Sequence, residues 1–234
     1  MQPPRVFPSL SRFQSAYRKF HSTETALLRV QNDLNLAIDR KQLSALVLLD
    51  LPAAFDTIDH DILLNRLSTS FGISNSALSL LTSYLSCRSQ AIHIGNESSS
   101  ILPLSRGVPQ GSVLGPLLFA LYTTPISRVI EGLPLKSHLY ADDTQLYLSF
   151  SSSHADQSLA QLSSALDKVF SWFCANRLSV NPSKTEYLLI GTSQQRAKVL
   201  NSSLCFQNLP LYPSQSARNL GVIFDSDLSF KRTF

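Results

Sequence analysis

The sequence predicts an α+β fold in which helices back a small antiparallel sheet. An apolar run at residues 46–49, ended by Asp50, indicates a buried strand. Residues 138–148 place two adjacent acids between short runs of strand-forming residues, a pattern typical of a β-hairpin with a polar tip. Between residues 159 and 173, apolar side chains recur at intervals of three and four, which predicts a helix packed beneath the sheet.

The composition is that of a globular chain with a mild positive charge. The 234 residues include 20 Lys and Arg against 16 Asp and Glu, and 44% are hydrophobic, which is ample for a core. A net charge of +4 does not by itself establish a nucleic-acid partner. Three isolated cysteines favour a reducing compartment, and no run approaches the ~18 apolar residues of a membrane helix. We therefore expect an intracellular protein, nuclear or cytoplasmic, without a membrane segment.

The N-terminal region divides into a leader and a helix. Residues 1–13 are rich in Pro, Ser and Arg and lack the apolar block of a secretory signal, so we assign them to a divergent leader. An organelle-targeting presequence is the alternative, because no acid occurs before Glu24. A helix is predicted from Ser22, which can cap it, through apolar residues at helical spacing as far as Ile38.

The pair Asp142-Asp143 and the acid Asp50 predict a metal site. Two neighbouring carboxylates repel each other, so a rigid turn that holds both is favoured when a divalent cation sits between them and a further acid. Asp50, directly after a buried strand, is the partner that we expect. For an isolated Asp-Asp pair, an ordinary polar turn is the alternative.

Between these acids the sequence predicts two helices and a hairpin. Asp59 is placed as the N-cap of one helix, and residues 74–85 form the next. Residues 90–94 and 101–104 are expected to pair as a hairpin around a polar loop.

The segment from Gly107 to Gly115 holds three of the eight glycines of the chain. Such density indicates close approach of the backbone to a ligand, with a plain loop as the alternative. Pro116 suits the first turn of a following helix.

Five ordered segments carry a family resemblance. They include Gly107-Val-Pro-Gln-Gly111 and Tyr140-Ala-Asp-Asp143, and their full ranges are 14–28, 48–60, 107–116, 140–143 and 178–186. Together they resemble the reverse transcriptases of non-LTR (LINE-type) retrotransposons, from about Gln14 to about Phe230. The resemblance implies a reverse transcriptase domain over residues 14–234, with the fingers and palm of a right-hand polymerase and no thumb before the chain stops.

The resemblance also implies a reaction. Asp50, Asp142 and Asp143 would be catalytic and would hold two Mg²⁺ ions, with Mn²⁺ as a substitute, for nucleotidyl transfer to a primer 3′-hydroxyl. The partners implied are an RNA template, a DNA primer and deoxynucleoside triphosphates, while the oligomeric state stays open.

Two further residues take roles from the same resemblance. Lys184 lies in the loop before a predicted strand and is the candidate general acid for pyrophosphate; a surface lysine is the alternative. Phe55 lies five positions beyond Asp50, where the family places a ring that excludes a 2′-hydroxyl; a core phenylalanine is the alternative.

The remaining nucleotide-binding residues are carried over from the matching motifs. Arg18 and Lys19 match a basic position that faces the incoming triphosphate, although a solvated basic loop explains them equally well. Gln110 and Gly111 match the signature that contacts the incoming nucleotide, and Ala141 belongs to the acidic hairpin tip.

The sequence departs from the family at Pro52, where a small polar residue is usual, and a proline there removes a backbone donor. A catalytically inactive retroelement fragment that retains only nucleic-acid binding is therefore the alternative function. A viral RNA-dependent RNA polymerase would share the acids, but Phe55 and residues 109–111 favour deoxynucleotides.

Residues 218–225 resemble the primer-grip strand of the family.

Overall fold

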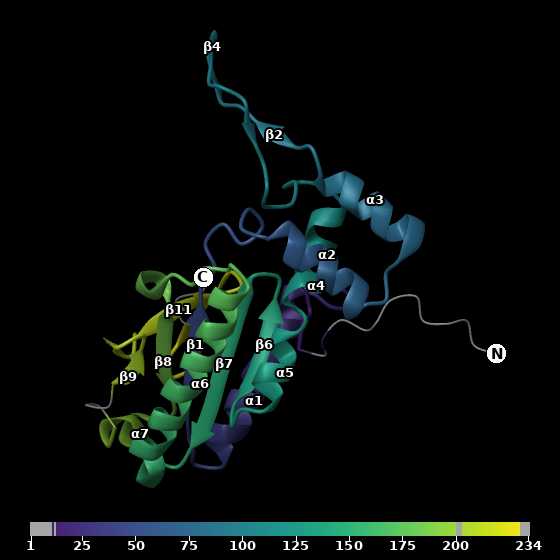
Figure 1. Ribbon diagram of the computed structural model, residues 1–234. Coiled ribbons are helices and arrows are strands. Elements are labelled where there is room, and N and C mark those ends of the chain that lie inside the picture. Colours follow the sequence, from purple (N-terminus) through teal and green to yellow (C-terminus); the bar gives the residue numbers. More distant parts are fainter. Residues whose placement is uncertain (1–10, 12, 200–202, 230–234) are drawn as a thin grey trace, which may run out of the picture.

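The computed structural model describes residue 11, residues 13–199 and residues 203–229. A four-stranded antiparallel sheet of order β6-β7-β1-β8 forms its centre (Figure 1). The strands are β1 (Leu43–Leu49), β6 (Lys136–Tyr140), β7 (Asp143–Phe150) and β8 (Glu186–Ile190). The predicted α+β class and the predicted buried strand are both confirmed.

The predicted acidic hairpin is confirmed as β6 and β7, and its tip is tight. Tyr140 pairs with Asp143, so Ala141 and Asp142 alone make the turn and Thr144 already lies in the strand. The tip therefore has two residues. One acid lies in the turn and the other at the start of β7.

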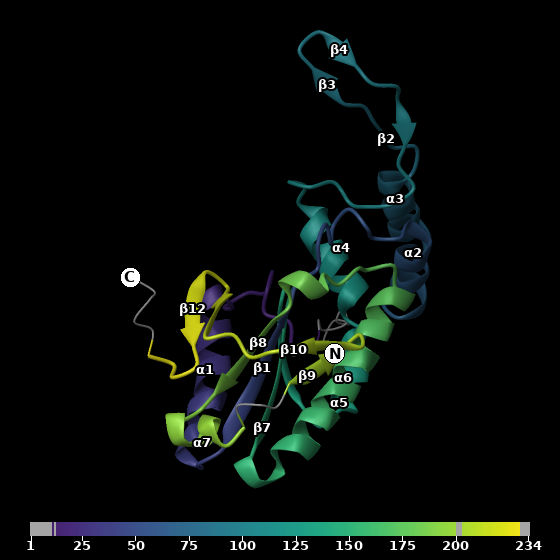
Figure 2. The ribbon, with the colours of Figure 1, turned by 90° about the vertical axis from the view of Figure 1, so that its left-hand side faces the viewer.

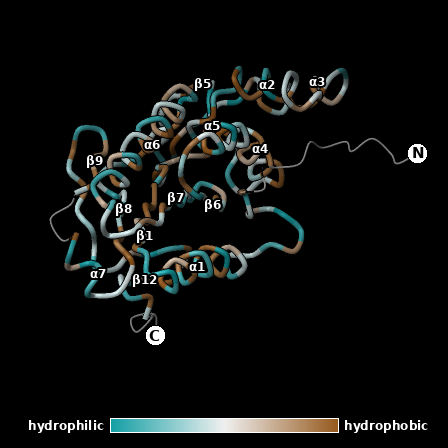
Figure 3. The backbone as a smooth tube through the Cα atoms, turned by 90° about the horizontal axis from the view of Figure 1, so that it is seen from below, coloured by the Kyte–Doolittle hydropathy of each residue, from teal (hydrophilic) through white to brown (hydrophobic). Residues whose placement is uncertain are grey.

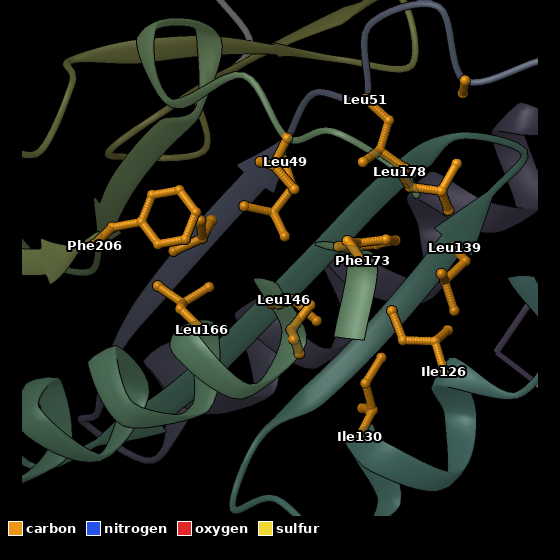
Figure 4. Packing of buried hydrophobic residues seen from close by; sticks show 14 of the residues in the cluster. Leu49, Leu51, Ile126, Ile130, Leu139, Leu146, Leu166, Phe173, Leu178 and Phe206 are labelled. Carbon is orange, nitrogen blue, oxygen red and sulfur yellow. The ribbon is translucent and has the colours of Figure 1, made fainter. Parts of the chain in front are cut away.

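One face of the sheet packs against α5 (Ile126–Glu131) and α6 (Ala155–Ala175), while α4 (Leu114–Thr123) lies higher in the view of Figure 2 and adds residues to the same hydrophobic cluster. Leu146 of β7 meets Phe173 of α6 within the larger hydrophobic cluster (Figure 4). The apolar positions predicted for this helix are all buried, namely Leu159, Leu162, Leu166, Val169 and Phe173. The prediction of a helix beneath the sheet is confirmed, as is Pro116 in the first turn of α4.

The opposite face is covered by α1 (Thr23–Asp39) and by a hairpin of β11 (Ser216–Asn219) and β12 (Val222–Asp225). Seen from below, α1 and β12 lie on one side of the sheet and α5 and α6 on the other (Figure 3). Ser22 caps α1 as predicted, in a capping box with Thr25. A second cluster joins Leu27, Val30 and Leu34 of α1 to sheet residues such as Leu46 and Leu188.

A projecting arm follows α2 (His60–Thr69) and α3 (Asn75–Leu85), as Figure 1 shows. Asp59 caps α2 as predicted, accepting hydrogen bonds from the N–H groups of Asp61 and Ile62. The arm consists of β2 (Ser89–Gln90), β3 (His93–Ile94), β4 (Glu97–Ser98) and β5 (Leu102–Pro103). The predicted hairpin exists, but the predicted loop was too long, because Glu97 and Ser98 pair with β3.

The C-terminal region adds small elements beside β8. They are the 3₁₀ turn η2 (Pro182–Lys184), α7 (Ser193–Ala197), β9 (Leu204–Phe206) and β10 (Leu209–Leu211). A further 3₁₀ turn, η1 (Ser152–His154), precedes α6. A single strand over 218–225 was wrong: Leu220 (φ 47°) and Gly221 (φ 89°) turn the chain between β11 and β12.

Two sequence predictions, the N-terminal leader and the absence of a membrane helix, concern the chain as a whole, whereas the structure describes only part of it. The leader at 1–13 falls almost wholly outside the described residues. Within the described part of the chain, none of the helices combines the length and apolar character that crossing a bilayer requires.

Candidate active site at one end of the sheet

The three predicted acids gather where β1 ends and β7 begins. Leu49, the last residue of β1, pairs with Thr144 of β7 in antiparallel register. Asp50 follows the first strand and Asp143 precedes Thr144, so the register carries both to the same edge of the sheet. Asp142 sits beside them in the hairpin turn.

The acids interact electrostatically. Asp143 as a whole is exposed, but its carboxyl group is partly buried. This burial, and to a smaller extent repulsion from Asp142 and Asp50, raises the pKa of Asp143 to about 6. Burial also raises the pKa of Asp142, a backbone hydrogen bond opposes the rise, and the charge of Asp50 adds to it. The three acids together therefore carry more negative charge than the residues around them stabilise.

The donor set suits a hard divalent cation such as Mg²⁺, which prefers carboxylate oxygens. One carboxylate oxygen of Asp50, Oδ2, is buried and has no hydrogen-bond partner among the described residues. In the same part of the chain, no three His, Cys, Asp or Glu side chains already lie close enough together to hold a metal ion, so a cation would have to draw these acids closer to one another. The unpartnered oxygen and the mutual repulsion are the two features that a bound cation would relieve.

A pocket of about 410 Å³ opens beside the acids. It brings together four predicted site residues from three distant segments, Phe55, Gln110, Gly111 and Asp142. Its other lining residues are Tyr17, Ala53, Ala54, Pro109 and Pro116. The glycine-rich segment thus faces Asp142 across one cavity.

A larger hollow of about 770 Å³ lies between α1 and β6 and contains none of the predicted site residues. Two of its charged side chains are paired with each other, since Lys136 Nζ lies 2.8 Å from Asp33 Oδ1, and the Tyr147 hydroxyl also donates to Asp33 at 2.6 Å. The smaller pocket is therefore the better candidate for chemistry despite its size.

The glycine-rich loop is fastened to the turn after Asp50 by backbone hydrogen bonds. The N–H of Gly107 donates to the carbonyl of Ile58 (2.8 Å), and the N–H of Val108 donates to that of Phe55 (2.9 Å). Gly107 has φ 83°, and a Cβ there would lie 2.9 Å from the carbonyl oxygen of Asp56. Only glycine permits this contact, which sets the position of the pocket wall.

Comparison with known proteins now decides the family. Residues 2–224 match the model of the family described as Reverse transcriptase (RNA-dependent DNA polymerase). The chain belongs to this reverse transcriptase family. The resemblance to non-LTR retrotransposon polymerases, expected from the five motifs, is confirmed.

Named relatives of this reverse transcriptase chain come from Drosophila. It is 30% identical over 98% of its length to the probable RNA-directed DNA polymerase from transposon BS of Drosophila melanogaster, of which it covers 25%. It is 28% identical over 97% of its length to the RNA-directed DNA polymerase from mobile element jockey of Drosophila funebris, covering 24%. The chain thus spans about a quarter of the length of these relatives.

Solved structures of telomerases share the fold. The apo telomerase from Candida tropicalis, truncated from the C-terminal domain, superposes with a TM-score of 0.62 at 13% identity, over 92% of this chain and 40% of that one. Telomerase from Candida albicans, in complex with a fragment of telomeric RNA, gives 0.61 at 14% identity over 93% and 35%. At this identity the likeness establishes the fold alone.

Phe55 of the reverse transcriptase has two environments. Its half-buried ring lines the pocket and also packs on Phe119, with the ring centroids 4.8 Å apart. The position is compatible with a gate and with a core residue, so the assignment of Phe55 as a gate stays a prediction.

The basic residues carried over from the family lie outside the pocket lining. The Arg18 guanidinium donates to the carbonyls of Ser11 and Gln14, each at 3.1 Å, and the Lys19 ammonium stands 4.9 Å from the centre of the Phe20 ring. Lys184 is exposed on η2. Their roles stay predictions.

Two residues at the site were missed by sequence reasoning. Tyr17, next to Arg18, lines the pocket with φ 59°, and burial and then the charge of Asp142 raise its pKa. Asp56 accepts hydrogen bonds from Gln110 Nε2 at both oxygens, 3.1 and 3.0 Å. The only signal for either was its place within the family-like segments 14–28 and 48–60.

Proposed function

We propose that this chain is the fingers-and-palm core of an RNA-directed DNA polymerase of a non-LTR retrotransposon. It would extend a DNA primer with deoxynucleotides along an RNA template. The observation that carries the proposal is the pocket in which Phe55 and Gln110 face Asp142, at the end of the sheet where the strand register also brings Asp50 and Asp143. An acidic edge alone would bind a cation, and the pocket adds room for a nucleotide.

The acids define the reacting centre. Asp50, Asp142 and Asp143 would hold two divalent ions, which when bound activate a primer 3′-hydroxyl and offset the charge on the leaving pyrophosphate. In the free protein, burial and then the charges of Asp142 and Asp50 raise the pKa of Asp143, which is the response expected of a carboxylate that lacks a nearby positive charge.

The pocket wall selects the substrate. The ring of Phe55, supported from behind by Phe119, would occupy the space that a 2′-hydroxyl needs, so a deoxyribose fits better than a ribose. Gln110 is held at its amide nitrogen by Asp56, which leaves its carbonyl oxygen to accept a hydrogen bond from the sugar. Gly111 would present bare backbone to the nucleotide, and Ala141 would lie nearby with only a small side chain.

Charged side chains outside the pocket would bind the phosphates of the nucleotide or donate a proton to them. Lys184 would donate a proton to pyrophosphate as it leaves, and Arg18 and Lys19 would contact the triphosphate once a nucleotide is present. Template and primer would be held mainly through their backbone phosphates, so binding should weaken with salt.

Addition of a single nucleotide tests the proposal. The purified chain is mixed with an RNA template, a DNA primer and one complementary deoxynucleotide at low salt, with and without Mg²⁺. Extension that requires Mg²⁺ and is lost in Asp142→Asn is the expected result. Binding of the primer–template without any extension would favour the alternative, a fragment that only holds nucleic acid.

A further inference from the structure

The residues before α1 pair in parallel with β6, which is an edge strand of the sheet. The N–H of Ser15 donates to the carbonyl of Leu139 (2.9 Å), and the N–H of Leu139 donates to that of Phe13 (2.8 Å). Gln14 therefore pairs with Leu139 and lies two residues from the acidic tip of the hairpin. This pairing joins segments that are far apart in the sequence.

The side chain of Gln14 binds the backbone of the tip. Its Oε1 accepts hydrogen bonds from the N–H groups of Ala141 (3.0 Å) and Ala16 (2.9 Å), and its Nε2 donates to the carbonyl of Ala141 (3.3 Å). Two backbone donors on one amide atom identify that atom as the oxygen. Gln14 is only 3% exposed, so a lost partner would not be replaced by bulk water.

Ala141 is the residue that requires such support. Its φ of 55° is in the left-handed region, which a residue with a Cβ disfavours. It is also the first of the two turn residues and directly precedes Asp142. Because Asp142 and Asp143 repel each other, a loose turn would let the two carboxylates move apart.

We infer that Gln14 is a positioning residue, which clamps both polar backbone groups of Ala141 and thereby holds Asp142 and Asp143 in place for a divalent cation. The inference rests on the proposed function, since it assumes that these acids bind metal. It gives the first of the family-like segments a role at the acids, through the backbone and without contact to substrate.

The test measures Mn²⁺ binding by the full chain, from loss of the free-ion electron paramagnetic resonance signal. Gln14→Met keeps the length of the side chain and removes all three hydrogen bonds. We expect it to weaken Mn²⁺ binding about tenfold, as expected for hydrogen bonds lost without replacement. Gln145→Met is the matched control, because Gln145 is another buried glutamine of the sheet, bonded instead to Asn219. It should change the affinity less than twofold.

Two reference variants separate the possible failures. If wild type binds Mn²⁺ no better than Asp142→Asn, the metal site and the proposed function fail together. If wild type binds better than Asp142→Asn but Gln14→Met equals wild type, the clamp alone is wrong. The clamp is equally wrong if Gln145→Met weakens binding as much as Gln14→Met.

A rescue distinguishes positioning from general loosening. Glycine adopts a positive φ readily, so Ala141→Gly added to Gln14→Met should recover at least threefold of the lost affinity. No recovery would contradict the inference. If Gln14→Met does not fold, hydrogen exchange on wild type decides: the Ala141 amide should exchange at least tenfold more slowly than that of Asp142, and equal rates would overturn the clamp.

Discussion

The backbone N–H of Asn181 donates a 3.0 Å hydrogen bond to the carbonyl oxygen of Asp50. This contact fastens the loop that carries Lys184 to the residue that carries the first of the three acids. Asn181 also caps η2, accepting from the N–H and the hydroxyl of Ser183. Lys184 is thus exposed, yet its backbone is anchored close to the candidate reacting centre.

Lys184→Ala should lower kcat for nucleotide addition by about a hundredfold and leave KM for the nucleotide nearly unchanged. The reason is that a general acid acts on the leaving group and contributes little to ground-state binding. Single-turnover kinetics give both constants. Lys198→Ala, at another exposed lysine, is the control, and an equal effect of the two substitutions would remove Lys184 from the mechanism.

Asp142→Asn should abolish nucleotide addition without unfolding the chain. Removing one carboxylate charge weakens cation binding and relieves the repulsion that raises the pKa of Asp143, so the melting temperature in the absence of metal should stay equal or rise. Thermal melting and Mg²⁺-dependent extension measure the two effects. Asp167→Asn, at an exposed position of α6, should alter neither, and an active Asp142→Asn chain would refute the assignment.

Phe55→Val should raise the kcat/KM for a ribonucleotide relative to the matching deoxynucleotide, because a smaller side chain leaves room for the 2′-hydroxyl. It should also cost about 1–3 kcal/mol of stability through the lost packing on Phe119. Phe170→Val is the matched control, since Phe170 is half-buried and packs against Phe206 far from the pocket. If both variants keep the wild-type ratio, Phe55 is a core residue.

His138 should make the fold sensitive to acid. Burial, and then the positive charges of Arg29 and His21, lower its pKa from 6.5 to about 4. The unfolded chain therefore takes up the proton first, so stability is full above pH 6.5 and is lost as the pH falls towards 4, by at most about 3 kcal/mol.

The measurement compares urea unfolding of wild type and His138→Phe from pH 7.5 to 4. The raised pKa of Asp143 acts in the opposite direction over part of this range, so the difference between the two proteins isolates the histidine. Wild type should lose more stability than the variant as the pH falls. Parallel pH curves would show that His138 does not contribute.

The sequence was sufficient for the elements whose signals are local. The apolar run before Asp50, the hairpin around the acids and the caps at Ser22 and Asp59 are each visible within about ten residues, and all are confirmed. The turn at residues 220–221 has a local signal in Gly221, whereas the family resemblance favours one continuous strand. At this position the local signal agrees with the structure and the resemblance does not.

The rest depends on contacts between distant segments. The amide of Gln14 reaches Ala141 across 127 positions, and no periodicity or spacing predicts that pair. The pairing of Gln110 with Asp56 across 54 positions is of the same kind. Motifs identified which residues matter, and only the fold shows which of them hold one another in place.

Gly107 and the projecting arm differ in their tolerance of amino-acid substitution. A Cβ there would press on the carbonyl of Asp56 and push away the loop that bears Gln110. Random substitution would therefore silence the site in one step at this codon, whatever amino acid replaced the glycine. In the projecting arm, where Ile92 and Ile94 are 67% and 78% exposed, the same number of substitutions could accumulate without touching the pocket. Substitutions would thus be tolerated in the arm but not at Gly107.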